Sequence, residues 1–505
     1  MPHRTLSSIV VLISIVFSAA LLPLNIVSVN TAGDINRIDS YVNTAMQRHN
    51  IPGLALAITQ GDQITFSKGY GKAGGGRIVT PDTPFYIGSQ SKSFTALSIM
   101  QLVEQGKLEL NTSVQTYLPW FQVADPQASQ LITIRQLLQH TSGLSEEGYV
   151  ADFPPDTDLE TMVRDLSRAN ITAPVGSKMQ YFNQGYSTLG LIIETVTGQS
   201  YGEYIYEHIF APLKMRNSFT DSELANTADL SQGYSQIFML AVPLKQIVYQ
   251  SDLPAGYIIS TANDMARFLM TLGNGGELDG VRILTPENVQ LIFTPNYAIN
   301  STYGFGWYIS KYYGETQITH GGDTERFHTS VLLLPERDLS LVILINENHL
   351  LKDFNEYNAL LWDVAAILTN HPMPKEGLSS TIFGWGFFVL WLIILASAVR
   401  KFENFSKWRS KMLTWNKWYK SFDIAKHMLW IVLTIVIVII IVPNFLGRSF
   451  SMRWFSGFLP DIAIIVSTLV LVDVLQIVLK LWIIIRQKKV PMVIPNSKFW
   501  IGSSI

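Results

Sequence analysis

The chain has 505 residues, more than one hydrophobic core usually organises, so two or more structural units are expected. Hydrophobic residues make up 48% of the chain and charged residues 15%, against roughly 25% charged in ordinary soluble domains, which indicates that part of the chain lies in lipid. The net charge of -2 gives no reason to expect a nucleic acid partner, and the lack of cysteine excludes disulfides, a thiol nucleophile and a cysteine-ligated metal.

Residues 1–33 have the pattern of an export segment. His3 and Arg4 precede a stretch from Thr5 to Gly33 that contains no charged residue. This is the arrangement of a secretory signal or of an uncleaved N-terminal anchor, and Pro23 within the long apolar run leaves both alternatives open. In either case we expect the domain that follows to be exported.

Residues 34–370 are expected to form the exported domain, with strands at both ends and helices between them. Apolar residues at helical spacing from Ile35 to Met46 predict an opening helix. Hairpins are predicted around Gly61-Asp62 and around 335–338. The predicted strands are, in chain order, 54–59, 63–67, 316–320, 329–334 and 339–345. With helices such as 96–105 and 186–197 between them, the pattern predicts one sheet built from both ends of the domain.

The candidate nucleophile is Ser89, which begins the only Ser-x-x-Lys in the chain, Ser89-Gln90-Ser91-Lys92. An amphipathic run with Leu97 and Met100 on one face follows, so the serine is expected at a helix N-terminus. A spacing of three residues places Ser89 and Lys92 on the same helix face, where the amine can activate the hydroxyl. Such a spacing also arises by chance on solvated helices.

The string Tyr-x-Asn occurs twice, and its context separates the two copies. Tyr41-Val42-Asn43 lies within the predicted opening helix, where it is expected to be structural. Tyr181-Phe182-Asn183 follows a Pro-Val-Gly turn and precedes a glycine, so it is expected on a loop, where side chains can project into a cleft. There the tyrosine can relay a proton and the asparagine can hold a substrate amide.

A third candidate segment is His320-Gly321-Gly322-Asp323, which ends a predicted strand. The two glycines would allow a substrate backbone to lie close to the strand edge. The nine histidines of the chain include no His-Glu-x-x-His or similar close pair, so metal-free chemistry is expected.

Residues 381–505 differ from the domain before them, and a linker at 371–380 is expected between the two. Three apolar stretches are long enough to cross a hydrocarbon core of about 30 Å. These predicted spans are 381–399, 428–446 and 462–485. Only Asp473 and Lys480 interrupt them, and Asp473 beside Gln476 can equally serve a function or hydrogen-bond a neighbouring helix.

The connecting segments predict the orientation of the spans. Residues 400–427 carry eight lysines and arginines against only Glu403 and Asp423, which predicts a cytoplasmic loop. A site for anionic lipid is the alternative explanation of the same charges. The charged residues of the tail after residue 485 are all basic, which predicts a cytoplasmic C-terminus and places 34–370 outside the cytoplasm.

In this order, the motifs of Ser89, Tyr181 and His320 resemble the three motifs of the class C β-lactamase-like family. Further similar segments are Pro52-Gly53-Leu54-Ala55, Phe85-Tyr86-Ile87-Gly88, the run from Leu137 to Leu144, Pro212-Leu213-Lys214-Met215 and Tyr303-Gly304-Phe305-Gly306-Trp307. The match runs from about Ile35 to about Asn346. It implies an α/β fold, in which an antiparallel sheet of the β-lactamase/transpeptidase type is flanked by helices and carries an inserted all-α domain, followed here by a three-helix transmembrane region.

The resemblance also implies roles for the motif residues. Ser89 would be acylated, Lys92 and Tyr181 would share the proton transfers, and which of the two is the base stays open. The backbone N–H groups of Ser89 and Asp323 would form the oxyanion hole. The residues implied to bind substrate are Asn183, His320, Gly321 and Gly322. Many penicillin-active members have lysine where this chain has His320, which weakens the case for a substrate carboxylate bound there.

We therefore expect a membrane-anchored serine hydrolase that acts outside the cytoplasm on a cell-envelope ester or amide, such as a D-alanyl group of peptidoglycan or teichoic acid. The alternatives are a β-lactamase or a general esterase and, from another class, a penicillin-binding membrane sensor, although no output domain is recognisable in the basic segment. The expected partners are an acyl substrate and the lipid bilayer. No cofactor, metal or nucleic acid is expected.

Overall fold

The computed structural model describes residues 32–373, 379–442 and 451–487. The predicted export segment therefore lies almost wholly outside the described residues. The chain divides into two compact units, one up to Ser380 without Gln236–Leu240, and one made of Gln236–Leu240 and the residues from Thr381 onward.

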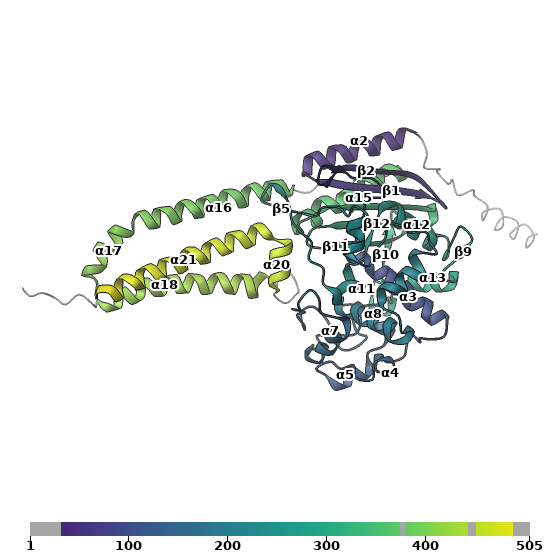
Figure 1. Ribbon diagram of the computed structural model, residues 1–505, viewed down its shortest axis with the longest axis horizontal. Coiled ribbons are helices and arrows are strands. Elements are labelled where there is room, and N and C mark those ends of the chain that lie inside the picture. Colours follow the sequence, from purple (N-terminus) through teal and green to yellow (C-terminus); the bar gives the residue numbers. More distant parts are fainter. Residues whose placement is uncertain (1–31, 374–378, 443–450, 488–505) are drawn as a thin grey trace, which may run out of the picture. The chain divides into compact units, whose positions relative to one another are not determined.

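The first unit contains a seven-stranded sheet in the order β10-β11-β12-β13-β1-β2-β3 (Figure 1). Its strands are β1 (Gly53–Gln60), β2 (Gln63–Gly74), β3 (Arg77–Ile78), β10 (Tyr308–Tyr312), β11 (Glu315–Asp323), β12 (His328–Leu334) and β13 (Leu339–Ile345). The first strand pairs antiparallel with the last long one, with Leu56 opposite Ile343. The prediction of one sheet built from both ends of the domain is confirmed.

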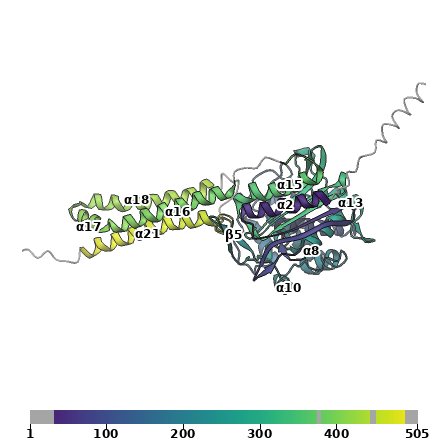
Figure 2. The same cartoon turned by 90° about the horizontal axis from the view of Figure 1, so that it is seen from above.

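One face of this sheet is covered by α2 (Ala32–His49) and α15 (Asn358–Thr369), which lie side by side (Figure 2). Alternate residues of β1, such as Leu56 and Ile58, join the apolar cluster beneath these helices. The residues between them, such as Ala57, join the larger cluster on the opposite face, where α12 (Ala262–Gly273) packs on β1 and β13. Successive side chains of a strand point to opposite faces of the sheet. Since both sets of β1 side chains lie in an apolar cluster, both faces of the sheet are buried.

A helical block is inserted between β2 and β10. Its helices are α3 (Ser91–Glu104), α4 (Val114–Tyr117), α5 (Pro126–Leu131), α6 (Ile134–Leu138), α7 (Leu159–Asp165), α8 (Asn183–Thr197), α9 (Tyr201–Ile205), α10 (Ser222–Thr227), α11 (Leu253–Gly256), α12 and α13 (Pro286–Ile292). Further short strands of the unit are β4 (Phe85–Tyr86), β7 (Ile259–Ser260), β8 (Glu277–Leu278), β9 (Val281–Arg282) and β14 (Glu347–Asn348), whereas β5 (Tyr234–Ile237) and β6 (Leu240–Pro243) include residues of both units.

The predicted amphipathic character of the helix after Ser89 is wrong. In α3 the residues from Ser91 to Leu102 are all buried, because α8, α11 and α13 pack around this helix. A helix enclosed in this way needs no polar face, and its polar residues are bonded internally instead, as Ser98 is to the Phe94 carbonyl oxygen.

The second unit consists mainly of helices: α16 (Ser380–Glu403), α17 (Phe405–Thr414), α18 (Lys417–Val436), α20 (Met452–Phe458) and α21 (Pro460–Gln487). Three stretches are long and apolar enough to cross a membrane: Ser380–Glu403, Lys417–Ile441 and Pro460–Arg486. This confirms the prediction of three apolar helices, although the end of the predicted span 428–446 lies outside the described residues.

The basic segment 400–427, predicted as a loop, is largely helical. It contains the end of α16, all of α17 and the first half of α18. No glycine or proline occurs in it, and Asn416 caps α18 by accepting a hydrogen bond from the backbone N–H of Tyr419. The connections between these helices are therefore short.

Candidate active site

Ser89 and Lys92 lie where a single 3₁₀ turn, η1 (Gly88–Gln90), runs directly into α3. Lys92 Nζ donates a hydrogen bond of 3.0 Å to Ser89 Oγ. The lysine is 0% exposed, whereas Ser89 is partly exposed. The predicted sharing of one face is thus observed, with a buried amine beneath an accessible hydroxyl.

The amine of Lys92 is held by two further partners from different helices. It donates to Asn183 Oδ1 at 2.7 Å, at the start of α8, and to the Ala255 carbonyl oxygen at 2.7 Å, in α11. The ring of Tyr181 lies 4.7 Å from the amine. In its protonated form the Lys92 nitrogen has three N–H groups, and its hydrogen bonds to Ser89, Asn183 and Ala255 use all three.

Burial makes Lys92 a group that exchanges its proton near neutral pH. Desolvation lowers the pKa of Lys92 to about 7, although the negative charges of Glu146 and Asp252 oppose this shift. Burial has the opposite effect on Tyr181 and raises its pKa well above the usual value, even though a hydrogen bond with Ser89 favours the phenolate. At neutral pH, therefore, Lys92 is present partly as the free amine and Tyr181 keeps its proton.

The second motif spans a loop and a helix start. Tyr181 and Phe182 lie in irregular backbone, in agreement with the predicted loop, but Asn183 is the first residue of α8. The Asn183 amide is held on both sides, because its oxygen accepts from Lys92 and its Nδ2 donates to Glu146 Oε1 at 2.7 Å. Its orientation is consequently fixed before any substrate binds.

The third motif places a buried neutral histidine at the site. His320 lies on β11, donates from Nδ1 to the Gly321 carbonyl oxygen at 2.5 Å and accepts on Nε2 from the Tyr303 hydroxyl at 3.0 Å. Burial, and next the charge of Lys92, lower the pKa of His320 to about 3. The imidazole thus carries no charge at neutral pH.

The two glycines after His320 have different surroundings. A Cβ on Gly322 would lie 1.9 Å from the carbonyl oxygen of Ile87, whereas a Cβ on Gly321 would meet only the Thr329 carbonyl oxygen at 3.8 Å. Gly88 has a φ of +53°, and a Cβ there would lie 2.3 Å from the backbone nitrogen of Asp323. The turn that carries Ser89 and strand β11 therefore touch backbone to backbone, which only glycine permits.

This close approach brings together the two segments of the predicted oxyanion hole. In the sheet, β10 pairs with β11 only as far as Thr319, so the stretch from His320 to Asp323 pairs on its β12 side alone. The backbone nitrogen of Asp323 thus lies beside the residue that precedes Ser89. The Asp323 carboxylate accepts hydrogen bonds from His328 and Asn348 instead.

Three further residues of the site had not been singled out from the sequence. Glu146 follows the segment Leu137–Leu144 on a loop and bonds Asn183. Tyr303 bonds His320 and belongs to a segment that resembles the family. His140 has a left-handed φ of +56° and accepts a hydrogen bond from the backbone N–H of Phe182 at 3.2 Å, and its ring contacts the ring of Tyr181 in a tilted arrangement with centroids 4.4 Å apart. His140 thus packs against Tyr181, and burial lowers the pKa of His140 well below its usual value.

The other Tyr-x-Asn string lies away from these residues. Tyr41 is on α2, and its hydroxyl donates to the Asp363 carboxylate of α15. This hydrogen bond joins α2 to α15, the two helices that together cover one face of the sheet.

One cluster near the site has the composition of a metal site. Asp323, His328 and Asp353 place their ligand atoms within 4.8 Å of one another. His328 already hydrogen-bonds through both ring nitrogens, to Asp323 at 2.8 Å and to Ser330 at 2.8 Å. These hydrogen bonds explain why the three side chains lie close together without a metal ion. The expectation of metal-free chemistry stays a prediction.

Comparisons with known proteins find similar sequences and similar solved structures. Protein flp of Staphylococcus aureus (strain MW2) is 28% identical over 321 residues, so the match covers 62% of this chain but only 63% of that relative's length. Penicillin-binding protein 4 of Amycolatopsis lactamdurans is 30% identical over 332 residues, which are 63% of this chain and 87% of that protein. The solved structure of the octameric penicillin-binding protein homologue from Pyrococcus abyssi aligns with a TM-score of 0.60 at 26% identity, over 68% of this chain and 79% of that one.

The family model named Beta-lactamase matches residues 38–366, which hold all three motifs. The matched region contains both ends of the sheet and the helical block between them. The chain therefore belongs to the beta-lactamase family of serine hydrolases.

Proposed function

We propose that this protein hydrolyses a D-alanyl ester of the cell envelope through an acyl-enzyme at Ser89. The observation that carries the proposal is the hydrogen bond of 3.0 Å between the buried amine of Lys92 and the accessible hydroxyl of Ser89. A serine hydroxyl is a weak nucleophile unless an adjacent base takes its proton, and Lys92 has a pKa of about 7 suited to that role.

In the proposed mechanism the free amine of Lys92 takes the proton of Ser89 as Oγ attacks the substrate carbonyl carbon. The backbone N–H groups of Ser89 and Asp323 stabilise the negative charge that develops on the carbonyl oxygen. Tyr181, still protonated, donates its proton to the leaving oxygen and regains one from Lys92. Water then attacks the acyl group on Ser89, and the proton that this water loses returns through the same pair to the serine oxygen.

The charges around Asn183 favour a D-alanyl ester over a D-alanyl-D-alanine amide. The ester presents a free ammonium group and no carboxylate, whereas the terminal dipeptide presents a carboxylate. Glu146 supplies a negative charge next to Asn183, and His320 supplies a neutral ring where many penicillin-active members have a cation. An ammonium substrate thus finds a complementary charge.

The same protein preparation can test the nucleophile and the substrate. Full-length wild type and Ser89→Ala are incubated with a fluorophosphonate and a fluorescent penicillin, and the labelled peptide is mapped. Ser91→Ala is the matched control, because the Ser91 hydroxyl is buried and donates to the Gly88 carbonyl oxygen. We expect labelling of wild type and Ser91→Ala only, and labelled Ser89→Ala would refute the proposed nucleophile.

Release of D-alanine is then measured from D-alanylated teichoic acid and from a D-alanyl-D-alanine peptide, alongside hydrolysis of a chromogenic cephalosporin. We expect faster turnover of the ester. Preferential cleavage of the peptide would point to a carboxypeptidase, and rapid cleavage of the cephalosporin to a β-lactamase. Stable labelling without turnover of any of the three would favour the sensor alternative.

We further propose that the hydrolase domain faces outward and that the three apolar helices cross the membrane. The supports are the apolar length of these helices and the excess of basic residues in 400–427. Protease added to intact protoplasts should degrade the domain that contains Ser89 and spare the segment around Lys407. The reverse pattern would mean that the topology is inverted.

A further inference from the structure

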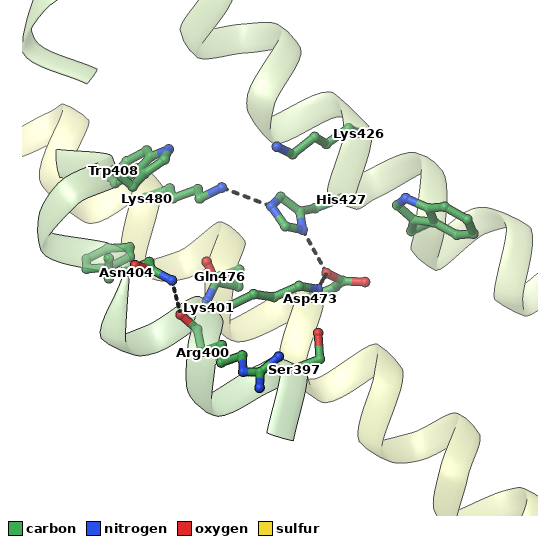
Figure 3. A pocket seen from close by; sticks show the side chains of 12 residues that line it. Ser397, Arg400, Lys401, Asn404, Trp408, Lys426, His427, Asp473, Gln476 and Lys480 are labelled. Atoms are coloured by element: carbon green, nitrogen blue, oxygen red, sulfur yellow. Dashed lines mark hydrogen bonds and ion pairs between the residues drawn. The ribbon is translucent and has the colours of Figure 1, made fainter. Parts of the chain in front are cut away.

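The helices of the second unit enclose a polar pocket of about 450 Å³ (Figure 3). Its walls come from α16, α17, α18 and α21. The charged residues that line it are Arg400, Lys401, Lys426, Lys480 and Asp473. Five charged side chains thus gather at the ends of apolar helices, and such a cluster is a candidate binding site.

Hydrogen bonds connect one side of the pocket into a chain. Figure 3 shows Lys480 bonded to His427, and His427 bonded to Asp473, at 2.9 Å and 2.7 Å. Lys480 also donates to Asp423 at 2.6 Å, and Lys426 pairs with the other oxygen of Asp423 at 2.5 Å. Asp423 and Asp473 are the only carboxylates in this network of described residues.

Positive charge is therefore in excess. The four cations of the lining face two carboxylates, Asp423 and Asp473, which leaves a surplus of two positive charges. Lys401 is only loosely paired, 3.8 Å from Asp473. Within the part of the chain that the structure describes, Arg400 has no ion pair at all.

An unused hydrogen-bond donor also lines the pocket. Gln476 is 3% exposed, and its side-chain nitrogen has no hydrogen-bond partner among the residues that the structure describes. A buried N–H group without an acceptor is unfavourable unless a ligand supplies the acceptor. The pocket thus combines surplus positive charge with an unsatisfied donor, which is the complement of an anion rich in acceptor oxygens.

The pocket lies where the apolar runs of the helices end, which favours the headgroup of a lipid as the bound anion. Arg400 directly follows the apolar run of α16, and His427 directly precedes that of α18. Lys480 lies 20 residues after Pro460, or about 30 Å along α21, which is about the thickness of a hydrocarbon core. Trp408 and Trp430 line the same pocket, and tryptophan is enriched where headgroups begin.

We propose that this pocket binds the phosphate of an anionic phospholipid headgroup, with Arg400, Lys401 and Gln476 as its donors. A free phosphate shares the chemistry of a phosphodiester headgroup, but the level of the pocket at the end of the apolar runs favours the lipid. On the predicted topology this is the cytoplasmic leaflet, where anionic lipids and basic residues meet.

The test uses the full-length chain in nanodiscs of phosphatidylglycerol and phosphatidylcholine in equal parts, followed by native mass spectrometry of the lipids that stay bound. We expect wild type to retain phosphatidylglycerol in preference to phosphatidylcholine. Arg400→Gln and Gln476→Leu should each weaken this binding about tenfold, the usual effect of losing a hydrogen bond to a charged group. Arg409→Gln is the matched control, because this exposed arginine of α17 makes the same charge change outside the pocket.

Fluorophosphonate labelling of Ser89 and the helical content are measured for each variant, so that a folding defect is recognised. Retention without preference for phosphatidylglycerol, or an equal loss in Arg409→Gln, would overturn the proposal. Millimolar inorganic phosphate is added in a parallel arm. If phosphate displaces the lipid from wild type but not from Arg400→Gln, the pocket binds both free phosphate and the lipid headgroup. If phosphate does not displace the lipid, the lipid is the ligand.

Discussion

The pH dependence of Ser89 acylation follows directly from the burial of Lys92. With a pKa of about 7, the fraction of Lys92 present as the free amine rises from about one tenth at pH 6 to about nine tenths at pH 8. If this amine takes the proton of Ser89, the single-turnover acylation rate should rise about tenfold over that range and level off above it. A tyrosine base would instead give a rate still rising near pH 10, because burial raises the pKa of Tyr181.

Removing the charge of Glu146 should shift this profile. The side-chain amide of Asn183 lies between Glu146 and Lys92 and hydrogen-bonds each of them at 2.7 Å. The negative charge of Glu146 raises the pKa of Lys92. Glutamine can still accept from Asn183 Nδ2, so Glu146→Gln removes charge while keeping the hydrogen bond. The midpoint should move to lower pH by on the order of one unit.

The assay is stopped-flow acylation of the full-length protein by a fluorogenic ester from pH 5 to pH 10, for wild type, Glu146→Gln and Glu147→Gln. Glu147 is the exposed neighbour and should leave the midpoint unchanged. A rate that does not change between pH 6 and pH 8, or a midpoint unmoved in Glu146→Gln, would refute the assignment of Lys92 as the base.

Two further variant pairs test the geometry. Gly322→Ala should destabilise the protein by about 3 kcal/mol and abolish acylation, because its Cβ would meet the Ile87 carbonyl oxygen, whereas Gly321→Ala should fold within about 0.5 kcal/mol of wild type. Thermal unfolding compares them, and equal stability of both would contradict the backbone contact. Tyr181→Phe should slow turnover about 100-fold, and Tyr41→Phe should leave it unchanged. Equal loss of steady-state turnover in the two tyrosine variants would remove Tyr181 from the proton transfer.

Apart from the sheet built from both ends of the domain, the features that the sequence predicted depend on residues close together in the chain. Ser89 and Lys92 are three positions apart, so helical geometry alone places them side by side. The hairpin strands around Gly61 likewise follow from two strand-forming segments and the turn signal between them. The family resemblance added the link between Ser89, Tyr181 and His320, which no local pattern contains.

The residues that the sequence did not predict act through tertiary contacts. Glu146 is one acidic residue on a loop, and only the fold brings it to Asn183. The apolar spacing after Lys92 suggested an amphipathic helix, but helices on several sides of α3 override that pattern. The two glycines after His320 looked equivalent in the sequence, and only the position of η1 gives Gly322 its separate role.

The site needs both parts of the first unit, because its two chemical requirements conflict. Lys92 must be buried for its pKa to fall, and Ser89, three residues earlier, must remain accessible to a substrate. The helical block satisfies the first requirement, since Asn183 and Ala255 enclose the amine from α8 and α11. The sheet satisfies the second, since β11 supports the Ser89 turn by a glycine contact that leaves its own edge unpaired. The helical block therefore supplies the buried base Lys92, the sheet supplies the unpaired edge of β11, and both are in contact with the turn that carries Ser89.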